Sequence, residues 1–277
     1  IIPLLVKSGV DVNGKDEDGL TPLHYALLPL RAEAVKALID CGADPSVADK
    51  RGETALMKAI DYADDATLRY LLAQPASVAT LNSALTFDSR ESALHLAVKK
   101  NKPDLVKLLL EAGSLVNQPD GYRQTPLYLA FDRCLPEMAG LLIERGADVK
   151  KCPSDTKYQR HLVHLAAKDE RTSLFSLLVK HGGNLHALDE DNANALHFAI
   201  GPPSLKNLKA LLNEGVNPDS TDKWGRRAID LLNFRRDPDY LEAARILLES
   251  GADPGISRDP QAKVSPLHIA VRQENLA

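Results

Sequence analysis

Five of the eight histidines in the sequence occupy the same position in a recurring motif: His24, His95, His164, His197 and His268. Imidazoles at a regular spacing are candidate ligands for a row of metal ions. In other copies of the motif, however, this position holds Met57, Tyr128 or Asp230, which would interrupt such a row. We therefore expect a structural role, in which the histidine at a helix start bonds to neighbouring backbone. The sequence predicts no metal site.

Paired carboxylates are the second candidate for chemistry, since acid/base catalysis can use two of them. Asp64 and Asp65 are adjacent, but we expect them at the polar start of a helix, where the helix dipole favours anions. The sequence has no Ser/His/Asp arrangement with a supporting motif, no phosphate-binding Gly-rich loop and no HExxH. It predicts no enzyme and no cofactor.

Composition narrows the class of partner. The 277 residues are 44% hydrophobic and 26% charged, with a formal net charge of −4, which argues against binding nucleic acid through a general positive field. No apolar run reaches the roughly 18 residues of a membrane helix. The three cysteines, Cys41, Cys134 and Cys152, have no CxxC spacing and indicate a reducing compartment. We expect an intracellular protein, cytoplasmic or nuclear, without membrane insertion in this segment.

The single Trp of the chain stands in the stretch "TDKWGRR" at 221–227, beside Gly225 and among basic residues. A tryptophan next to a turn glycine is either packed under a neighbour or presented to a partner. The choice depends on the position of this stretch in the larger pattern.

That pattern is an internal repeat. Similar hexapeptides begin at Thr21 (TPLHYA), Thr54 (TALMKA), Ser92 (SALHLA), Thr125 (TPLYLA), His161 (HLVHLA), Asn194 (NALHFA), Arg227 (RAIDLL) and Ser265 (SPLHIA). Their first residues are separated by 33, 38, 33, 36, 33, 33 and 38 positions. The motif therefore repeats with a base period of 33 residues, lengthened in places by small insertions.

One copy has the signals of two short helices. Thr or Ser caps the first helix, and Pro after it suits the first helical position. A second helix follows, as in "PDLVKLLLEAG" from Pro103, with apolar residues at helical spacing. Gly ends it, because a left-handed C-cap favours Gly. About a dozen turn-rich residues then lead to the next copy.

These segments resemble the ankyrin repeat in the TPLHxA start, the G-A-D after the outer helix and the 33-residue period. The resemblance covers essentially the whole chain. It implies an all-α solenoid of stacked inner and outer helices, with β-hairpin fingers on one side. The expected single domain, 1–277, has repeats at 16–48, 49–86, 87–119, 120–155, 156–188, 189–221 and 222–259, with partial repeats at 1–15 and 260–277.

Both ends cut through repeats without a polar cap, so we expect further repeats or domains to flank the chain. The insertion at 73–92 is either a tolerated surface loop or a weak stacking point between two halves. The family usually has Gly two residues before the Thr, as at Gly19 and Gly52. Arg90 and Arg123 take this position elsewhere, where we expect altered turns or strain.

The finger tips suggest a binding surface. Three residues before each capping position, Tyr122, Tyr158 and Trp224 occupy one slot within four consecutive copies. Stacked helices lie about 8–10 Å apart, so this row would span roughly 25–30 Å. The family usually binds partners through its fingers and inner-helix edges. The expected partner-binding residues are therefore Tyr122, Tyr158, Trp224, Lys223, Arg226, Phe234, Arg235, Arg236 and Tyr62.

The leading hypothesis is a non-catalytic module that binds a partner protein or peptide on this concave surface, where aromatic and Arg residues form hot spots. Alternatively, the aromatic side chains only cover neighbouring fingers. A second hypothesis is a structural or regulatory segment of a larger channel, toxin, effector or enzyme, with mainly intramolecular contacts. Fold alone does not decide between them.

One modification is also suggested by the resemblance. Ankyrin repeats with Leu eight residues before a finger Asn, and Asp-Val just before it, resemble substrates of an oxygen-dependent asparaginyl hydroxylase. "LVKSGVDVN" places Leu5 and Asn13 in this register, and "LLEAGSLVN" places Leu109 and Asn117 there less well.

Overall fold

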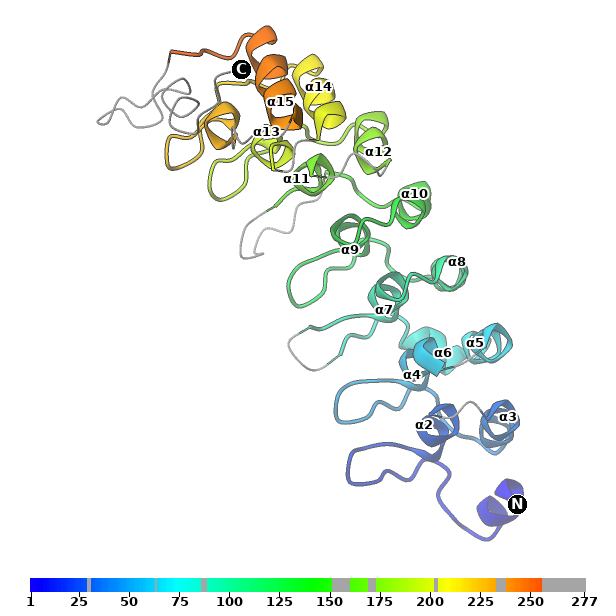
Figure 1. Ribbon diagram of the computed structural model, residues 1–277. Coiled ribbons are helices and arrows are strands. Elements are labelled where there is room, and N and C mark those ends of the chain that lie inside the picture. The colour runs from blue at the N-terminus through cyan, green and yellow to red at the C-terminus, as the bar shows by residue number, and fades with distance from the viewer. Residues whose placement is uncertain are drawn as a thin grey trace. The chain divides into compact units, whose positions relative to one another are not determined.

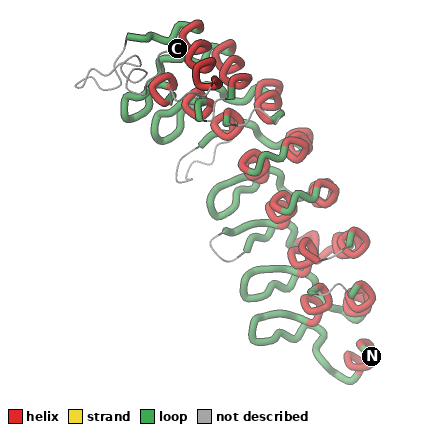
Figure 2. Tube along the Cα trace, in the orientation of Figure 1, coloured by secondary structure: helices red, strands yellow, loops and turns green. Residues whose placement is uncertain are grey.

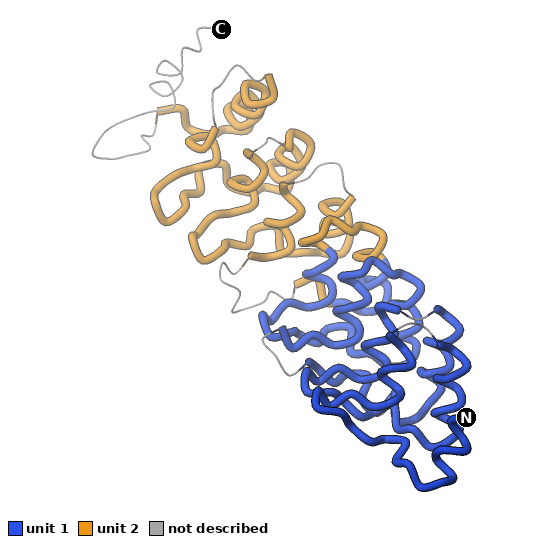
Figure 3. The backbone as a smooth tube through the Cα atoms, turned by 60° about the horizontal axis from the view of Figure 1, so that its bottom comes forward, with its two compact units in different colours: residues 1–130, 141–147 blue, residues 131–140, 148–277 orange. Residues whose placement is uncertain are grey.

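The computed structural model describes residues 1–28, 31–62, 64–85, 89–150, 160–168, 173–201, 204–232 and 238–255. The chain divides into two compact units (Figure 3). Unit 1 comprises residues 1–130 and 141–147, and unit 2 comprises residues 131–140 and 148–277. The predicted repeat boundaries stay a prediction, and 260–277 lies outside the described residues.

Unit 1 contains short helices joined by long turns (Figure 1). They are α1 (Ile2–Lys7), α2 (Pro22–Leu27), α3 (Ala32–Asp40), α4 (Ala55–Tyr62), α5 (Asp65–Leu72), α6 (Pro75–Ala79), α7 (Ala93–Lys99) and α8 (Pro103–Glu111). The helices α9 (Pro126–Asp132) and α10 (Pro136–Glu144) each contribute residues to both units.

Unit 2 continues the same alternation. Its further elements are α11 (Leu162–Ala167), α12 (Leu174–Lys180), α13 (Ala195–Ala199), α14 (Leu205–Asn213), the 3-10 helix η1 (Ala228–Leu231) and α15 (Pro238–Glu249).

Within each unit the inner helices stack on one another, and each packs against its own outer helix. In unit 1, α2 contacts α3 and α4, while α4 contacts α5 and α7. In unit 2, α11 contacts α12 and α13, and α13 contacts α14 and η1. The fingers project from the inner-helix side and the outer helices lie on the other side (Figure 2). The core is aliphatic, as shown by the buried Leu27, Leu56, Leu71, Leu94 and Leu196.

The motif histidines join each inner helix to the following finger. The backbone N–H of Thr21 donates to Nδ1 of His24 over 3.1 Å, and Nε2 lies 3.0 Å from the carbonyl oxygen of Glu53. Because Nδ1 accepts, the proton is on Nε2, which donates to the carbonyl. Equivalent bonds connect His95 and His197 to the carbonyls of Gln124 and Arg226. Nε2 of His164 instead lies 3.0 Å from the carbonyl oxygen of Ala187, which comes earlier in the next finger. The predicted structural role is confirmed for these four histidines.

In five of the described fingers one aspartate at the base organises the turn. Oδ1 of Asp222 accepts the backbone N–H groups of Trp224 and Arg226, each over 2.9 Å. The same pair of bonds recurs around Asp16, Asp49, Asp120 and Asp189. Among the described residues the only β-bridge joins Ala48 and Thr54. Backbone bonds close the same turns, since the Asp222 N–H donates to the Arg226 carbonyl and the Gly225 N–H donates to the Asp222 carbonyl, each over 2.9 Å.

The finger turn requires a left-handed residue. Gly19, Gly52 and Gly225 have φ values of 81°, 79° and 73°. Arg90 and Arg123 take φ values of 40° and 59° at the same position. The predicted strain is confirmed, because a residue with a Cβ loses roughly 1 kcal/mol or more in this region.

The insertion at 73–92 lies wholly inside unit 1 and does not separate the two units. Part of it forms α6, which packs against α5. Asn82 follows, and its side chain donates to the Gly113 carbonyl and accepts the Leu115 N–H. The structure favours a tolerated insertion, because the extra residues form α6 and Asn82 still bonds to the next repeat.

One copy replaces the capping residue and the histidine with an ion pair. Arg227 is 1% exposed, and its Nε and Nη2 donate to the two carboxylate oxygens of Asp230 over 2.9 and 3.1 Å. Nη1 reaches the Asp253 carbonyl over 2.5 Å and Asp219 over 3.3 Å. The Asp230 carboxylate accepts the Arg227 N–H over 3.0 Å, as histidine Nδ1 accepts the N–H of the capping residue elsewhere. The guanidinium supplies the bond to a later carbonyl that histidine Nε2 makes in other copies.

The histidine bonds predict acid sensitivity. Burial lowers the pKa of His164 from 6.5 to about 4, and burial likewise lowers the pKa of His24 and His95. Since the folded pKa lies below the unfolded value, stability is fully present above about pH 6.5. It should be lost as pH falls toward 4, by of order 3 kcal/mol from His164 alone.

The measurement is urea unfolding between pH 7.5 and 4.5. The control is His164→Met, which introduces the residue that the second copy has at Met57. This variant should be less stable at pH 7.5 but should show a flatter pH dependence. An unchanged pH dependence in the variant would contradict the role of His164.

The buried ion pair gives a second prediction. Asp230→Ala leaves the Arg227 charge without its main buried partner and should lower the free energy of unfolding by about 3–5 kcal/mol. The double variant Arg227→Thr/Asp230→His restores the pattern of the first copy and should recover most of this loss. A loss below about 1 kcal/mol in Asp230→Ala, measured by chemical denaturation, would refute the assignment.

Candidate functional site

The strongest candidate for a contact surface in unit 2 is the tip of the finger at 222–227. We call Asp191, Asp222, Lys223, Trp224 and Arg226 the Trp224 cluster. The Trp224 side chain is 55% exposed. The Lys223 Nζ and the Arg226 guanidinium carbon each lie 4.5 Å from its ring centroid. These cation–π contacts hold the ring without covering it.

Both cations of the Trp224 cluster are already paired within the protein. Arg226 Nε and Nη2 each lie 2.7 Å from Asp222 Oδ2, and Lys223 forms an ion pair with Asp191. Burial alone would raise the pKa of Asp222, but bonds from Arg226 and backbone N–H groups hold it below its usual value. The Asp191 carboxylate raises the pKa of Lys223. The cluster therefore presents an aromatic surface with little net charge.

The arrangement follows from the fold of two successive fingers. The Lys223 N–H donates to the Asp191 carbonyl over 2.7 Å, which joins the two tips. The Arg226 carbonyl accepts from His197 over 2.9 Å, which fixes the finger to α13. The backbone on both sides of Trp224 is thus held by neighbouring repeats.

Unit 1 presents two predicted aromatic residues. Tyr122 is 54% exposed at a finger tip, where its N–H donates to Asp120 and the Gly121 N–H donates to the Ser89 carbonyl. Tyr62 is 50% exposed at the end of α4. Next to it, Asp61 pairs with Lys100 over 2.7 Å. Tyr62 therefore borders a pair of opposite charges.

Four predicted residues, Tyr158, Phe234, Arg235 and Arg236, lie outside the described residues. Tyr122 and Trp224 belong to different units. The predicted row of three aromatic tips stays a prediction, while Lys223, Trp224 and Arg226 are brought together.

The predicted hydroxylation residues join adjacent repeats. Asn13 Nδ2 donates to the Gly42 carbonyl over 3.3 Å, and its Oδ1 accepts the Asp44 N–H over 2.7 Å. Asn117 donates to the Gly146 carbonyl over 3.1 Å. Both side chains therefore have structural partners, and their hydroxylation stays a prediction.

Sequence reasoning placed Lys168 at an inner-helix end but missed Arg160 and Phe198, which lie near it in unit 2. The Arg160 guanidinium carbon lies 5.2 Å from the centroid of the Phe198 ring, and Lys168 Nζ lies 5.8 Å from it. The ring also lies 4.9 Å from that of His164. The signal was available in the sequence, because residues adjoining the motif can be compared slot by slot between copies.

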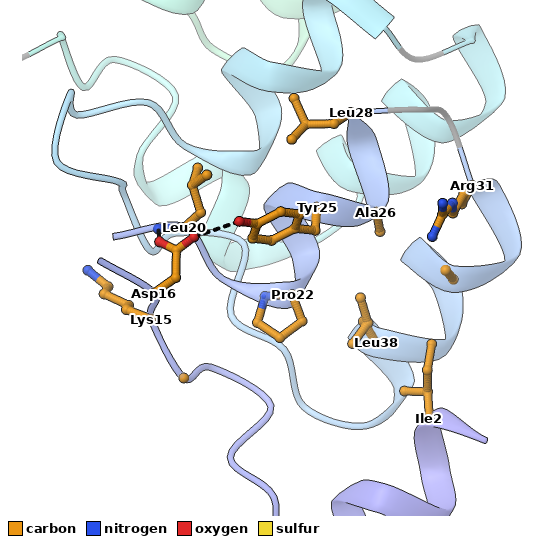
Figure 4. Close-up of a pocket in the computed structure, with 12 residues that line it drawn as sticks. Ile2, Lys15, Asp16, Leu20, Pro22, Tyr25, Ala26, Leu28, Arg31 and Leu38 are labelled. Atoms are coloured by element: carbon orange, nitrogen blue, oxygen red, sulfur yellow. Dashed lines mark hydrogen bonds between the residues drawn. The ribbon is translucent and has the colours of Figure 1, made fainter. Parts of the chain in front are cut away.

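A cavity of about 770 Å³ lies at the α1 end of unit 1, between α1, α2 and α3 (Figure 4). It is mainly apolar, and Leu20, Ala26 and Leu38 line it together with Tyr25, whose hydroxyl donates to Asp16 over 2.7 Å.

The described residues contain no group of three or more side chains suited to hold a metal ion. Asp64, considered above as half of a carboxylate pair, caps α5 by accepting the Thr67 N–H over 2.8 Å. In the same described part of the chain, every helix is too short or too polar to cross a bilayer.

Comparison with known proteins identifies the repeat. A family model described as ankyrin repeats, in three copies, matches residues 1–82 and 74–152. A crystal structure of the ankyrin repeat domain of Bcl-3, titled as a unique member of the IkappaB protein family, matches with a TM-score of 0.66 and 25% identity. It covers 83% of this chain and 100% of that one. The predicted fold class is confirmed.

Curated relatives show the same repeats in several kinds of protein. The mouse B-cell lymphoma 3 protein homolog is 27% identical over 87% of this chain and 46% of its own length. The mouse nuclear factor NF-kappa-B p105 subunit is 34% identical over 76% of this chain and 22% of its own length. The Drosophila melanogaster transient receptor potential channel pyrexia is 36% identical over 44% of this chain and 12% of its own length. The chain thus spans less than half the length of these relatives.

The Trp224 cluster can be tested by fluorescence, because the chain has one Trp. Arg226→Ala removes one cation from the ring and should reduce stability by about 0.5–1 kcal/mol. It should also shift Trp224 emission to longer wavelength and lower its anisotropy. The control is Arg245→Ala, at an exposed arginine of α15, which should leave the emission wavelength and the anisotropy of Trp224 unchanged. Equal spectra for Arg226→Ala and wild type would disprove the ring contact.

Proposed function

The chain belongs to the ankyrin repeat family, and from this premise we propose that it is a non-catalytic module that binds a partner protein or peptide. Repeats of this kind form extended surfaces to which each copy contributes side chains at equivalent positions. The matching family model describes a repeat and not a catalytic domain. The proposed contact surface comprises the finger tips and the neighbouring edges of the inner helices.

The observation that carries the proposal concerns Trp224, whose side chain is exposed while Lys223 and Arg226 hold its ring in place. A large aromatic ring that is 55% exposed leaves apolar surface in water, which binding would remove. Its cation contacts restrict the ring before a partner arrives, so less conformational entropy is lost on binding. Trp is also among the residues most enriched at interface hot spots.

We propose the exposed aromatic residues of unit 1, Tyr122 and Tyr62, as secondary contacts. The predicted anchors Tyr158, Phe234, Arg235 and Arg236 keep their proposed role, although they lie outside the described residues. We also propose an intracellular location, cytoplasmic or nuclear. The similarity to a protein named nuclear factor NF-kappa-B p105 supports this location.

A second candidate function is a segment of a larger protein that makes intramolecular contacts. The observation in its favour is the 36% identity over 124 residues to a protein named as a channel, in which the matched part is 12% of the length. The same exposed tips would then contact another part of the same polypeptide.

Site-specific photocrosslinking distinguishes the two candidates. A benzoylphenylalanine at position 224 should crosslink to a separate protein if the module binds in trans, and within the same polypeptide if it binds in cis. The matched control is position 241 in α15, where Leu241 is 40% exposed on an outer helix. The experiment uses the full-length protein in cell extract and identifies crosslinked peptides by mass spectrometry.

Affinity for the captured partner then tests the anchor. Trp224→Ala should weaken binding by at least about 30-fold, which corresponds to the ~2 kcal/mol of an interface hot spot. Leu241→Ala should bind as wild type. If position 241 crosslinks as efficiently as 224, and Trp224→Ala keeps full affinity, the proposed surface is wrong.

A further inference from the structure

At the α1 end of unit 1, several residues are more exposed than their equivalents in later repeats. Asp16 is exposed, whereas the aspartates at four later finger bases are buried. Pro22 and Ala34 line the cavity and are half-buried, whereas their equivalents in the next two copies are buried. These buried equivalents are Ala55 and Thr67 in the second copy, and Ala93 and Leu105 in the third. In those copies the inner helix packs on the inner helix before it, as α4 does on α2 and α7 does on α4.

The helix α1 occupies the place of an outer helix. It contacts the outer helix α3, as α5 contacts the outer helix α8. Leu5 is 50% exposed, whereas the leucines at the equivalent positions of later outer helices, Leu38, Leu71 and Leu109, are buried. Those outer helices pack against their own inner helices, as α3 does against α2. The open surface beside α1 is therefore the one that an inner helix of the same repeat would cover.

The Leu20 carbonyl is the first polar group at this end that specifies an occupant. It comes directly before the first capping residue, as the Glu53 carbonyl comes before the second. The Glu53 carbonyl accepts the Asp49 N–H and also bonds to Nε2 of His24 in the previous repeat. The Leu20 carbonyl accepts the Asp16 N–H over 3.0 Å and has no second donor in the described part of the chain. A histidine on a preceding inner helix would supply that donor.

The backbone N–H of Glu17 is the second such group. Its equivalent in the next finger is the Lys50 N–H, which donates to the Asp18 carbonyl of the previous finger over 3.0 Å. The Gly121 N–H donates in the same way to the Ser89 carbonyl over 2.7 Å. Among the residues that the structure describes, the Glu17 N–H has no acceptor. The first finger can therefore bond to the tip of one more finger.

Arg31 gives the direction of the helix that fits. It is exposed, precedes α3 and lines the cavity (Figure 4). Lys102 has the equivalent position before α8, and its Nζ donates to the Ile60 carbonyl near the C-terminus of the preceding inner helix, α4. On α14, Nδ2 of Asn207 likewise donates to a carbonyl near the C-terminus of α11 over 3.0 Å. Arg31 can therefore bond to the last carbonyls of a helix, where a cation is also favoured by the helix dipole.

We propose that Leu5, Leu20, Pro22, Ala34 and Arg31 form a seat for an α-helix from the polypeptide segment directly N-terminal to Ile1. A histidine in the first turn of this helix donates to the Leu20 carbonyl, and the last carbonyls of the helix accept from Arg31. The apolar face of the helix covers Leu5, Pro22 and Ala34, which removes their exposed surface from water. This inference goes beyond the proposed binding function and concerns a different surface.

The position of α1 favours a helix of the same polypeptide over a second copy or a separate protein. Ile2, the first residue of α1, lines the cavity. In later repeats a short loop joins the inner helix to its outer helix, such as residues 100–102 between α7 and α8. A helix in the seat would end within the length of such a loop from Ile2. The repeat then predicts a capping Ser or Thr about 33 residues before Thr21, with a histidine three positions after that cap.

Photocrosslinking from position 25 in the full-length protein tests the occupant. Tyr25 lines the cavity and is 52% exposed, and benzoylphenylalanine in its place should crosslink to a residue N-terminal to Ile1 in the same polypeptide. A mixture of nitrogen-14 and nitrogen-15 protein separates crosslinks within one polypeptide from those between copies. The matched control is position 62, where Tyr62 is 50% exposed on α4 and does not line the cavity.

Crosslinks from position 25 to a second copy or to a separate protein would overturn the assignment to the same polypeptide. Equal crosslinking of the N-terminal segment from positions 25 and 62, or no crosslink from position 25, would overturn the seat itself.

Amide hydrogen exchange of the full-length protein gives a second readout. Arg31→Glu places a carboxylate beside the last carbonyls of the seated helix, so amides of that helix should exchange at least tenfold faster. The α3 helix should stay folded in this variant, because Glu is favourable at a helix N-terminus. Lys36→Glu, at an exposed residue of α3, changes the net charge equally and should leave the exchange unchanged. Equal exchange in the two variants would overturn the Arg31 contact. These failures leave crosslinking at position 224 unaffected, so the proposed function is tested separately.

Discussion

The stacking of each repeat on its neighbour is the constraint on which the fold depends, and in four described copies a histidine bond to the next finger contributes to it. A pair of helices with fewer than ten residues each buries too little apolar surface to be stable alone, so each copy must be joined to its neighbour. His24, His95 and His197 donate Nε2–H to the carbonyl that precedes the next capping residue. The same ring accepts a backbone N–H through Nδ1. One side chain therefore accepts a backbone N–H at the helix start and donates to a backbone carbonyl of the adjacent finger.

The exposed surface is a consequence of this connection. Once His197 fixes the Arg226 carbonyl and Asp222 holds the turn, the backbone around Trp224 has little freedom. The ring is then presented in one position without having to be buried. At the Trp224 tip the repeat supplies the position, and the residue type supplies the exposed aromatic surface.

The sequence was sufficient for the fold because the period places every helix start, cap and finger in register. It also predicted the structural role of His24, His95, His164 and His197, which the structure confirms. His268, assigned in the same way, lies outside the described residues. It could not show that Arg226 is already paired with Asp222, because both were simply near Trp224 in the sequence. The replacement of the cap and histidine by Arg227 and Asp230 likewise needed coordinates, as only burial reveals the ion pair.

The most direct test of the connection is the tautomer of the motif histidines, measured by nitrogen-15 nuclear magnetic resonance of the full chain at pH 7. The account predicts neutral rings for His24, His95 and His164, with the proton on Nε2 exchanging slowly and Nδ1 unprotonated. Charged rings, or rings protonated on Nδ1, would show that these histidines do not join the repeats in the way described.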